Sequence, residues 1–280
     1  MSTSDRTRPT APSLLGAARR VFELSFGEML WSRRTIFMAL VVGGPVLLAV
    51  IFRVVESFGM PAMRVNGAPV AGASIFGVMI WMLYLRFIVP VLGVFYGTAL
   101  MADEVEDKTL TYLFTRPIPR GAVLLGKYLA YLACTSLVVL PSVMLSYFLV
   151  VPFGQVASTF TSLLLDLAIL GLGLAVYGAV FAYVGARLKR PLVSGLIFAF
   201  GWEQLALALP GYLRQFTVAH YLQALVPHAL PSDSALSLIQ GLFRQTPGAT
   251  VAVSWLAVFL FGFLWLAMRT VSRREYVLEQ

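Results

Sequence analysis

The sequence predicts an all-α membrane protein, and two observations lead to that class. Of the 280 residues, 59% are hydrophobic and only 12% are charged, whereas a soluble domain carries about 25% charged residues. The apolar residues also gather in long runs, each near the roughly 20 residues that a helix needs to cross a bilayer core of about 30 Å. None of these runs alternates apolar and polar residues as a barrel strand does, so we expect helices.

Six apolar runs are the expected transmembrane helices. They cover residues 35–55, 75–101, 123–150, 162–184, 192–209 and 250–268. The fifth run is the shortest, while the second and third are long enough to tilt in the bilayer. Residues 35–280 therefore form one predicted transmembrane domain. Ahead of it, residues 1–13 are rich in Ser, Thr and Pro, a composition typical of a disordered tail.

Residues 14–34 separate the tail from the first predicted span. Apolar residues alternate there with Arg19, Arg20, Glu23 and Glu28 at near-helical spacing. This pattern predicts an amphipathic helix that lies in the cytoplasmic membrane interface, with Trp31 at the membrane surface. A cytosolic extension of the first span is the alternative interpretation.

The basic residues predict the orientation of the chain. Six spans place both termini on one side of the membrane, and most of the 21 lysines and arginines then lie on that side. The positive-inside rule makes that side cytoplasmic, so we expect a multi-pass protein of the cell membrane with both termini in the cytoplasm. Because topology explains much of the net charge of +8, we predict no nucleic-acid partner.

One stretch nearly matches a nucleotide-binding loop. Gly121, Gly126 and Lys127 follow the G-x-x-x-x-G-K-[ST] spacing, but Tyr128 stands where the magnesium-binding Ser or Thr is required. The preceding residues TRPIPR contain two prolines, which argue against the strand that such a loop follows. We interpret the match as coincidental. The chain is expected to bind no cofactor and to catalyse no ATP hydrolysis itself.

The segment between the second and third spans carries a more specific order of residues. An acidic stretch is followed by a Thr-Leu pair, a Pro-x-x-Arg element and a Gly-Lys pair at the start of the third span. These residues are Asp103, Glu104 and Glu106, then Thr109 and Leu110, then Pro117 and Arg120, then Gly126 and Lys127. The order resembles the membrane subunits of the ABC-2 class of ATP-binding-cassette transporters. Lys108 departs from the family pattern, in which a glycine commonly precedes the Thr-Leu pair.

The resemblance implies a function and partners. It implies a permease subunit of an ATP-driven transporter, more often an exporter, with a cytoplasmic coupling helix between spans two and three. A separate cytosolic ATPase would supply ATP and magnesium, and a second permease subunit, identical or different, would complete the transporter. The implied ATPase contacts are Asp103, Glu104, Glu106, Thr109, Leu110, Arg116, Pro117 and Arg120. Arg187, Lys189 and Arg190 are a secondary candidate contact, although topology alone also explains this basic trio.

Three charged residues fall inside the predicted spans. Arg86, Asp166 and Glu203 each carry a cost of at least about 2.5 kcal/mol near the bilayer centre, so each requires a partner or a purpose. One hypothesis is a structural ion pair of Arg86 with Asp166 or Glu203. The other is a polar lining for a substrate path. An ion-coupled secondary transporter that uses the same three residues as a relay is the alternative function.

Small residues and histidines complete the candidate features. Gly93 and Gly97 form a G-x-x-x-G pair, and small residues also recur along the fourth span, which predicts close helix packing within the subunit. His220 and His228 are the only histidines, and they have no nearby cysteine or closely spaced carboxylate, so we predict no metal site.

Overall fold

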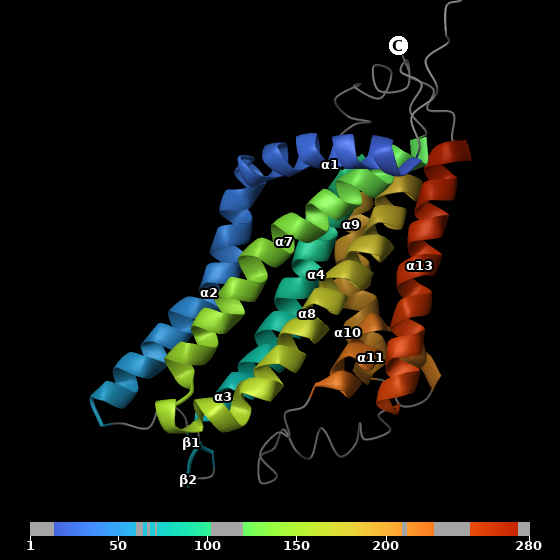
Figure 1. Cartoon of the computed structure of the whole chain (residues 1–280). Coiled ribbons are helices and arrows are strands. Elements are labelled where there is room, and N and C mark those ends of the chain that lie inside the picture. Colours follow the sequence, from blue (N-terminus) through green and yellow to red (C-terminus); the bar gives the residue numbers. More distant parts are fainter. Residues whose placement is uncertain are drawn as a thin grey trace, which may run out of the picture.

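A computed structural model describes residues 14–59, 64–65, 68–70, 72–101, 120–208, 212–226 and 247–273. These residues form a bundle of helices, with a two-residue antiparallel strand pair, β1 (Arg64–Val65) and β2 (Ala68–Pro69), at one end (Figure 1). The predicted all-α class is therefore confirmed for the described part of the chain. The predicted tail of residues 1–13 and the predicted coupling helix lie outside the described residues.

Among the residues that the structure describes, five helices are long and apolar enough to cross a membrane. They are Arg34–Ser57, Gly72–Met101, Gly121–Val150, Phe153–Arg187 and Ala249–Arg273. They coincide with the first, second, third, fourth and sixth predicted spans, and each extends beyond the predicted bounds at one or both ends. The fifth predicted span is a shorter apolar helix, Pro191–Leu207. The described residues therefore confirm five of the six predicted spans, and the remaining candidate, the run predicted to be the shortest, is a helix of fewer residues.

The first two helices meet at a sharp turn. Helix α1 (Leu14–Leu30) lies crosswise over one end of the bundle, and α2 (Arg33–Ser57) runs away from it along the bundle (Figure 1). The buried face of α1 consists of small residues, Ala17, Ala18, Val21 and Ser25. These pack on the third long helix so closely that a Cβ at Gly126 would lie 2.5 Å from the carbonyl oxygen of Ala18.

The second long helix departs from regular α winding. It consists of α3 (Gly72–Val78), the π-helical segment η1 (Met79–Ile88), α4 (Val89–Leu92) and the π-helical segment η2 (Gly93–Gly97), and continues to Met101. Pro90 stands between the two π segments. It has no amide N–H for the carbonyl of Arg86, and its ring would press on that carbonyl in an α-helix. The winding loosens on both sides of this proline, which an apolar run does not predict.

The centre of the bundle is the antiparallel pair α7 (Arg120–Val150) and α8 (Phe153–Arg187). A Cβ at Gly93 would lie 2.8 Å from that of Tyr177, and a Cβ at Gly97 would lie 2.8 Å from that of Phe181. On the other face of α8, a Cβ at Gly178 would lie 2.2 Å from Cε1 of Tyr131. These close approaches confirm that Gly93, Gly97 and Gly178 pack helices within the subunit.

The last part of the bundle contains several short helices before the final long one. A continuous helical stretch of α9 (Pro191–Leu196), the π-helical segment η3 (Ile197–Trp202) and α10 (Glu203–Ala208) runs back along α8. A 3-10 turn, η4 (Tyr212–Phe216), and α11 (Val218–Leu225) follow at the end of the bundle away from α1, and α13 (Ala249–Arg273) returns to the α1 end (Figure 1).

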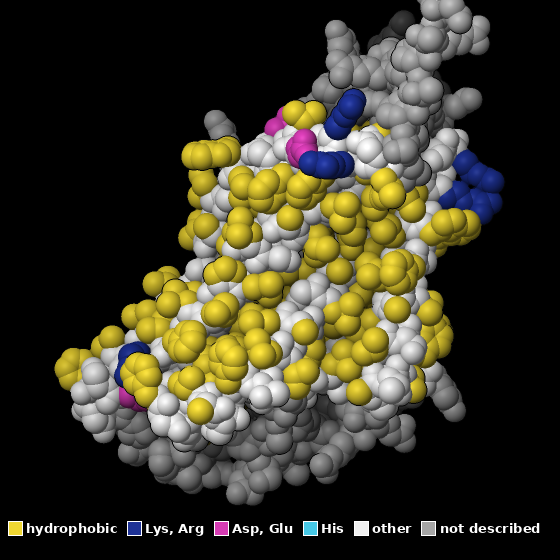
Figure 2. Space-filling view, in the orientation of Figure 1, with side chains coloured by type: hydrophobic (Ala, Val, Ile, Leu, Met, Phe, Trp, Pro, Cys, Tyr) yellow, Lys and Arg dark blue, Asp and Glu magenta, His cyan; other side chains and the backbone are white. Residues whose placement is uncertain are grey.

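The surface of the bundle matches a membrane environment. Figure 2 shows charged side chains at the two ends of the visible face and a mainly apolar surface between them. The outermost helices α2 and α13 bury only a small share of their residues, and α13 exposes Trp255, Phe261 and Trp265. Apolar surface on this scale requires cover by lipid or by another subunit.

Candidate functional site

The predicted ATPase contacts lie almost entirely outside the described residues. Only the main chain of Arg120, at the start of α7, is described. The residues on either side can be placed. A Cβ at Gly185, near the end of α8, would lie 2.4 Å from the carbonyl oxygen of Thr98, and a Cβ at Gly121 would lie within 4 Å of Met268 and Ser272. The chain therefore leaves and re-enters the bundle at the end where α8 and α13 finish.

The near-match to a nucleotide-binding loop lies within a helix. Gly121, Gly126 and Lys127 all belong to the uninterrupted helix α7. Gly126 packs against Ala18 and Val21 of α1, and the Tyr128 hydroxyl donates a hydrogen bond to the carbonyl oxygen of Ala175, 2.8 Å away. These residues therefore hold helices together, and the interpretation of the match as coincidental agrees with their positions.

Glu203, the first residue of α10, joins three helices within the bundle. Its side chain is 1% exposed and accepts a hydrogen bond from the Tyr177 hydroxyl of α8. Its Oε1 also accepts from the main-chain N–H of Val218, 3.1 Å away, and the N–H of Ala219 donates to the same carboxylate. The first N–H groups of a helix have no partner within the helix and carry partial positive charge. Glu203 therefore fixes the first turn of α11 to α8 and α10.

Arg86 binds a neighbouring amide. Its Nη2 donates to Oε1 of Gln204, 2.9 Å away, and its guanidinium lies 5.0 Å from the ring centre of Trp81. The sequence hypothesis paired Arg86 directly with Asp166 or Glu203, whereas this hydrogen bond joins Arg86 to Gln204. The reason is that Glu203 turns toward Tyr177 and α11, so the next residue, Gln204, is the one that reaches η1. Arg86 and Glu203 still interact electrostatically.

Asp166 lies apart from this cluster. It is fully buried on α8, eleven residues before Tyr177, or about 16 Å along the helix axis. The structure therefore brings Arg86 and Glu203 together through Gln204 but does not gather all three predicted intramembrane residues at one point.

Buried tyrosines are the functional contacts that the sequence interpretation missed. Tyr131 and Tyr128 of α7 donate to the carbonyl oxygens of Leu174 and Ala175, at 2.9 and 2.8 Å, and so hold α7 on α8. The Tyr84 hydroxyl forms hydrogen bonds of 3.1 Å with the hydroxyl oxygens of both Ser142 and Ser146. A tyrosine in an apolar interior must find an acceptor for its hydroxyl, so tyrosines within apolar runs were the available signal.

The short helix α11 also contacts the residue before it and the last long helix, α13. Thr217 precedes it, and its hydroxyl accepts from the His220 N–H at 3.4 Å. Tyr221 stacks on Trp255 of α13, with 6.1 Å between ring centres. Burial lowers the pKa of His220 below its usual value, and the positive charge of Arg214 lowers it further. Within the described residues no three His, Cys, Asp or Glu side chains lie together as a metal site requires.

The chain was compared with known protein families. The profile of the ABC-2 family transporter protein matches residues 20–272. The chain belongs to the ABC-2 transporter family. The match runs from α1 to the last residues of α13, so the family domain of this ABC-2 permease includes Arg86, Gln204 and Glu203. A comparison with curated proteins finds no match.

Proposed function

We propose that the chain is the permease subunit of an ATP-driven exporter, in which a separate cytosolic ATPase drives substrate movement and a second permease subunit completes the transporter. The observation that carries the proposal is the family match over residues 20–272. The arrangement of the bundle supports it, because α1, the start of α7 and the end of α13 all gather at one end (Figure 1). An ATPase docked there would contact several helices at once.

The α1 end of the bundle is proposed to be cytoplasmic. Exposed basic residues cluster there, among them Lys189 and Arg190 after α8 and Arg273 at the end of α13. The described arginines at the opposite end are fewer: Arg53, whose charge is offset by Glu56 4.0 Å away, and Arg214 of η4. This asymmetry follows the positive-inside rule. In this orientation residues 191–208 make the fifth of six crossings, because 18 helical residues span about 27 Å of a core of about 30 Å.

The segment between Met101 and Arg120 is proposed to dock on the ATPase, which would hold the ATP and magnesium. Its residues Asp103, Glu104, Glu106, Thr109, Leu110, Arg116, Pro117 and Arg120 are the proposed contacts. The position of α7 supports this role. Gly126 packs on α1, Tyr131 and Tyr128 bond to α8, and Gly121 lies beside α13. A displacement at the start of α7 would therefore be passed directly to three other helices.

The Arg86–Glu203 cluster is proposed to be structural. Every contact of Glu203 described above holds a neighbouring helix, and the carboxylate is shielded from solvent. A relay residue of an ion-coupled transporter must exchange protons with water, so this burial supports the structural role over the relay. The cluster would keep α11 seated at the outer end of the bundle while the remaining helices move.

Partner capture tests the proposal. The tagged chain would be extracted from its native membranes in a mild detergent, and its partners would be identified and assayed for ATPase activity. We expect a stoichiometric cytosolic ATPase whose activity depends on this subunit. Recovery of the intact chain with no ATPase, under conditions that preserve other complexes, would refute the permease assignment.

Charge reversal then locates the contact. We expect Glu104→Lys together with Glu106→Lys to reduce ATPase recovery several-fold, because charge pairs across an interface control association. Glu56→Lys is the matched control, since it reverses a carboxylate on α2 at the opposite end of the bundle. Both variants should reach the membrane in equal amounts. Unchanged ATPase recovery by the double variant would place the contact on another surface of the same end.

A further inference from the structure

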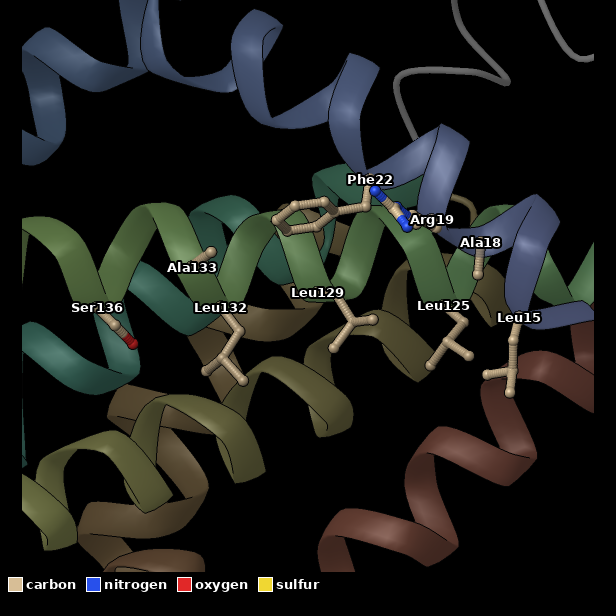
Figure 3. Close-up of a pocket in the computed structure, with 9 residues that line it drawn as sticks. All are labelled: Leu15, Ala18, Arg19, Phe22, Leu125, Leu129, Leu132, Ala133 and Ser136. Atoms are coloured by element: carbon tan, nitrogen blue, oxygen red, sulfur yellow. The ribbon is translucent and has the colours of Figure 1, made fainter.

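An apolar groove runs between α1 and α7. Its volume is about 470 Å³, within the roughly 300–1,000 Å³ of small-molecule sites in proteins. The side chains that line it come from both helices (Figure 3). They are Leu15, Ala18, Arg19 and Phe22 of α1 and Leu125, Leu129, Leu132, Ala133 and Ser136 of α7. Apart from Arg19 and Ser136 every lining residue is apolar, so the groove suits a hydrocarbon ligand.

Of the two polar residues, Ser136 lies at one end of the groove, whereas Arg19 lies on α1 between Phe22 and Leu15 (Figure 3). Arg19 belongs to α1, which lies crosswise at the end of the bundle, and Ser136 lies farthest along α7 (Figure 3). From Leu125 to Ser136 the lining of α7 extends for eleven residues, or about 16 Å. Half of a hydrocarbon core of about 30 Å is about 15 Å, so the groove is as long as one bilayer leaflet is deep.

We propose that this groove holds one phospholipid of the leaflet next to α1, with an acyl chain along α7 and its phosphate at Arg19. The Arg19 side chain is 81% exposed, and its Nε donates to Oε1 of Glu23 at 3.0 Å. That contact directs the guanidinium and uses one of its five N–H donors, so the Nη donors can bind phosphate oxygens. The acyl chain covers Leu129, which is otherwise 41% exposed.

The match of length and charge favours a lipid over a second copy of the chain. A phospholipid combines an anionic phosphate with a hydrocarbon chain about one leaflet long. The groove offers the cation Arg19 beside an apolar channel of about that length. The inference goes beyond the proposed function, because lipid occupancy requires neither an ATPase nor transport. Its test can therefore fail while the permease assignment stands, and the reverse also holds.

Native mass spectrometry of the purified full-length chain, titrated with dioleoyl-phosphatidylglycerol in detergent, tests the groove itself. We expect the wild type to retain one phospholipid that Leu129→Trp loses, because the indole fills the groove. Leu137→Trp is the matched control, since Leu137 is also an exposed leucine of α7 but does not line the groove. Equal retention by the Leu129→Trp and wild-type proteins overturns the proposal. So does a change of oligomeric state in Leu129→Trp with lipid retention intact, which would assign the groove to a second copy.

A second pair of variants tests the headgroup contact. Arg19→Gln should weaken phosphatidylglycerol binding about fivefold, the upper range for an exposed charge pair. Arg20→Gln removes an arginine that is also exposed but does not line the groove, and should leave binding unchanged. Because both side chains are exposed, neither change should unfold the protein. Equal affinity of these two variants overturns the placement of the phosphate at Arg19.

Discussion

Glu203→Ala tests most directly how the outer end of the bundle is held. The change removes the acceptor of the Tyr177 hydroxyl and of the main-chain N–H groups of Val218 and Ala219. The two N–H groups belong to the first turn of α11 and have no acceptor within that helix. We therefore expect α11 to detach from α8 and α10 before the rest of the bundle unfolds.

The size of the effect follows from the three lost contacts. Removing the acceptor of a buried donor costs about 1–3 kcal/mol, whereas hydrogen bonds between membrane helices average only about 0.6 kcal/mol in double-mutant cycles. The Tyr177 hydroxyl can rotate toward another acceptor, so the lower figure applies to it. The two main-chain N–H groups cannot, and about 1 kcal/mol each is a conservative value. The sum is about 2.6 kcal/mol for Glu203→Ala, against about 0.6 kcal/mol for Tyr177→Phe.

Thermal unfolding in detergent and limited proteolysis would measure these effects. For a domain of 150–250 residues, about 2.6 kcal/mol corresponds to a fall of roughly 5–10 °C in midpoint temperature. Leu205→Ala is the control, because it shortens an exposed side chain of the same helix. New cleavage between Phe216 and Leu225 in Glu203→Ala alone would show that α11 has detached. A midpoint within 1 °C of wild type, with no new cleavage, would refute the anchoring role of Glu203.

Two further predictions concern packing and pH. Gly178→Ala should destabilise the bundle by several kcal/mol, because its Cβ would lie 2.2 Å from Cε1 of Tyr131. Gly262→Ala is the control and should be neutral or stabilising, because nothing lies within 4 Å of its added Cβ. Equal thermal midpoints of the two variants would contradict this packing. Burial and Arg214 lower the pKa of His220, so the unfolded chain takes up a proton at this residue before the folded chain does. Stability should therefore fall as pH drops below about 6.5, the usual histidine pKa, and His220→Gln should reduce that fall when midpoints at pH 7.5 and 5.5 are compared. An identical loss in the variant would contradict it.

Apolar run length predicted the positions of the long helices because one physical constraint dominates them. A segment in hydrocarbon must satisfy its own main-chain hydrogen bonds and be apolar on its outside, and both demands are visible in composition. The same signal also indicated that the fifth apolar helix is the shortest of the six, and Pro191–Leu207 is shorter than the five long helices. Run length could not show the π-helical winding on either side of Pro90 or at Ile197–Trp202, because apolar composition is the same for both kinds of helix.

The intramembrane cluster was predicted only in part, for a similar reason. Charge alone identified Arg86 and Glu203, but their partners are set by the direction of each side chain. Adjacent residues of one helix point to different neighbours, so Glu203 turns toward Tyr177 while Gln204 turns toward Arg86. A periodicity argument could place such residues in a span but could not choose which of two consecutive side chains would meet a given partner.

The π-helical segments have a consequence for comparisons between relatives of this chain. A π turn closes its hydrogen bond from residue i to i+5, one residue more than an α turn. A relative that lacks one residue within Met79–Ile88 or Ile197–Trp202 can revert to α winding there and keep the same side chains facing the core on both sides. Within α8, which winds regularly throughout, the same deletion would rotate one half of the helix and move Gly178 away from Tyr131. We therefore expect single-residue gaps in alignments of this family to fall in the π segments, and the core contacts on either side to keep their identity across such gaps.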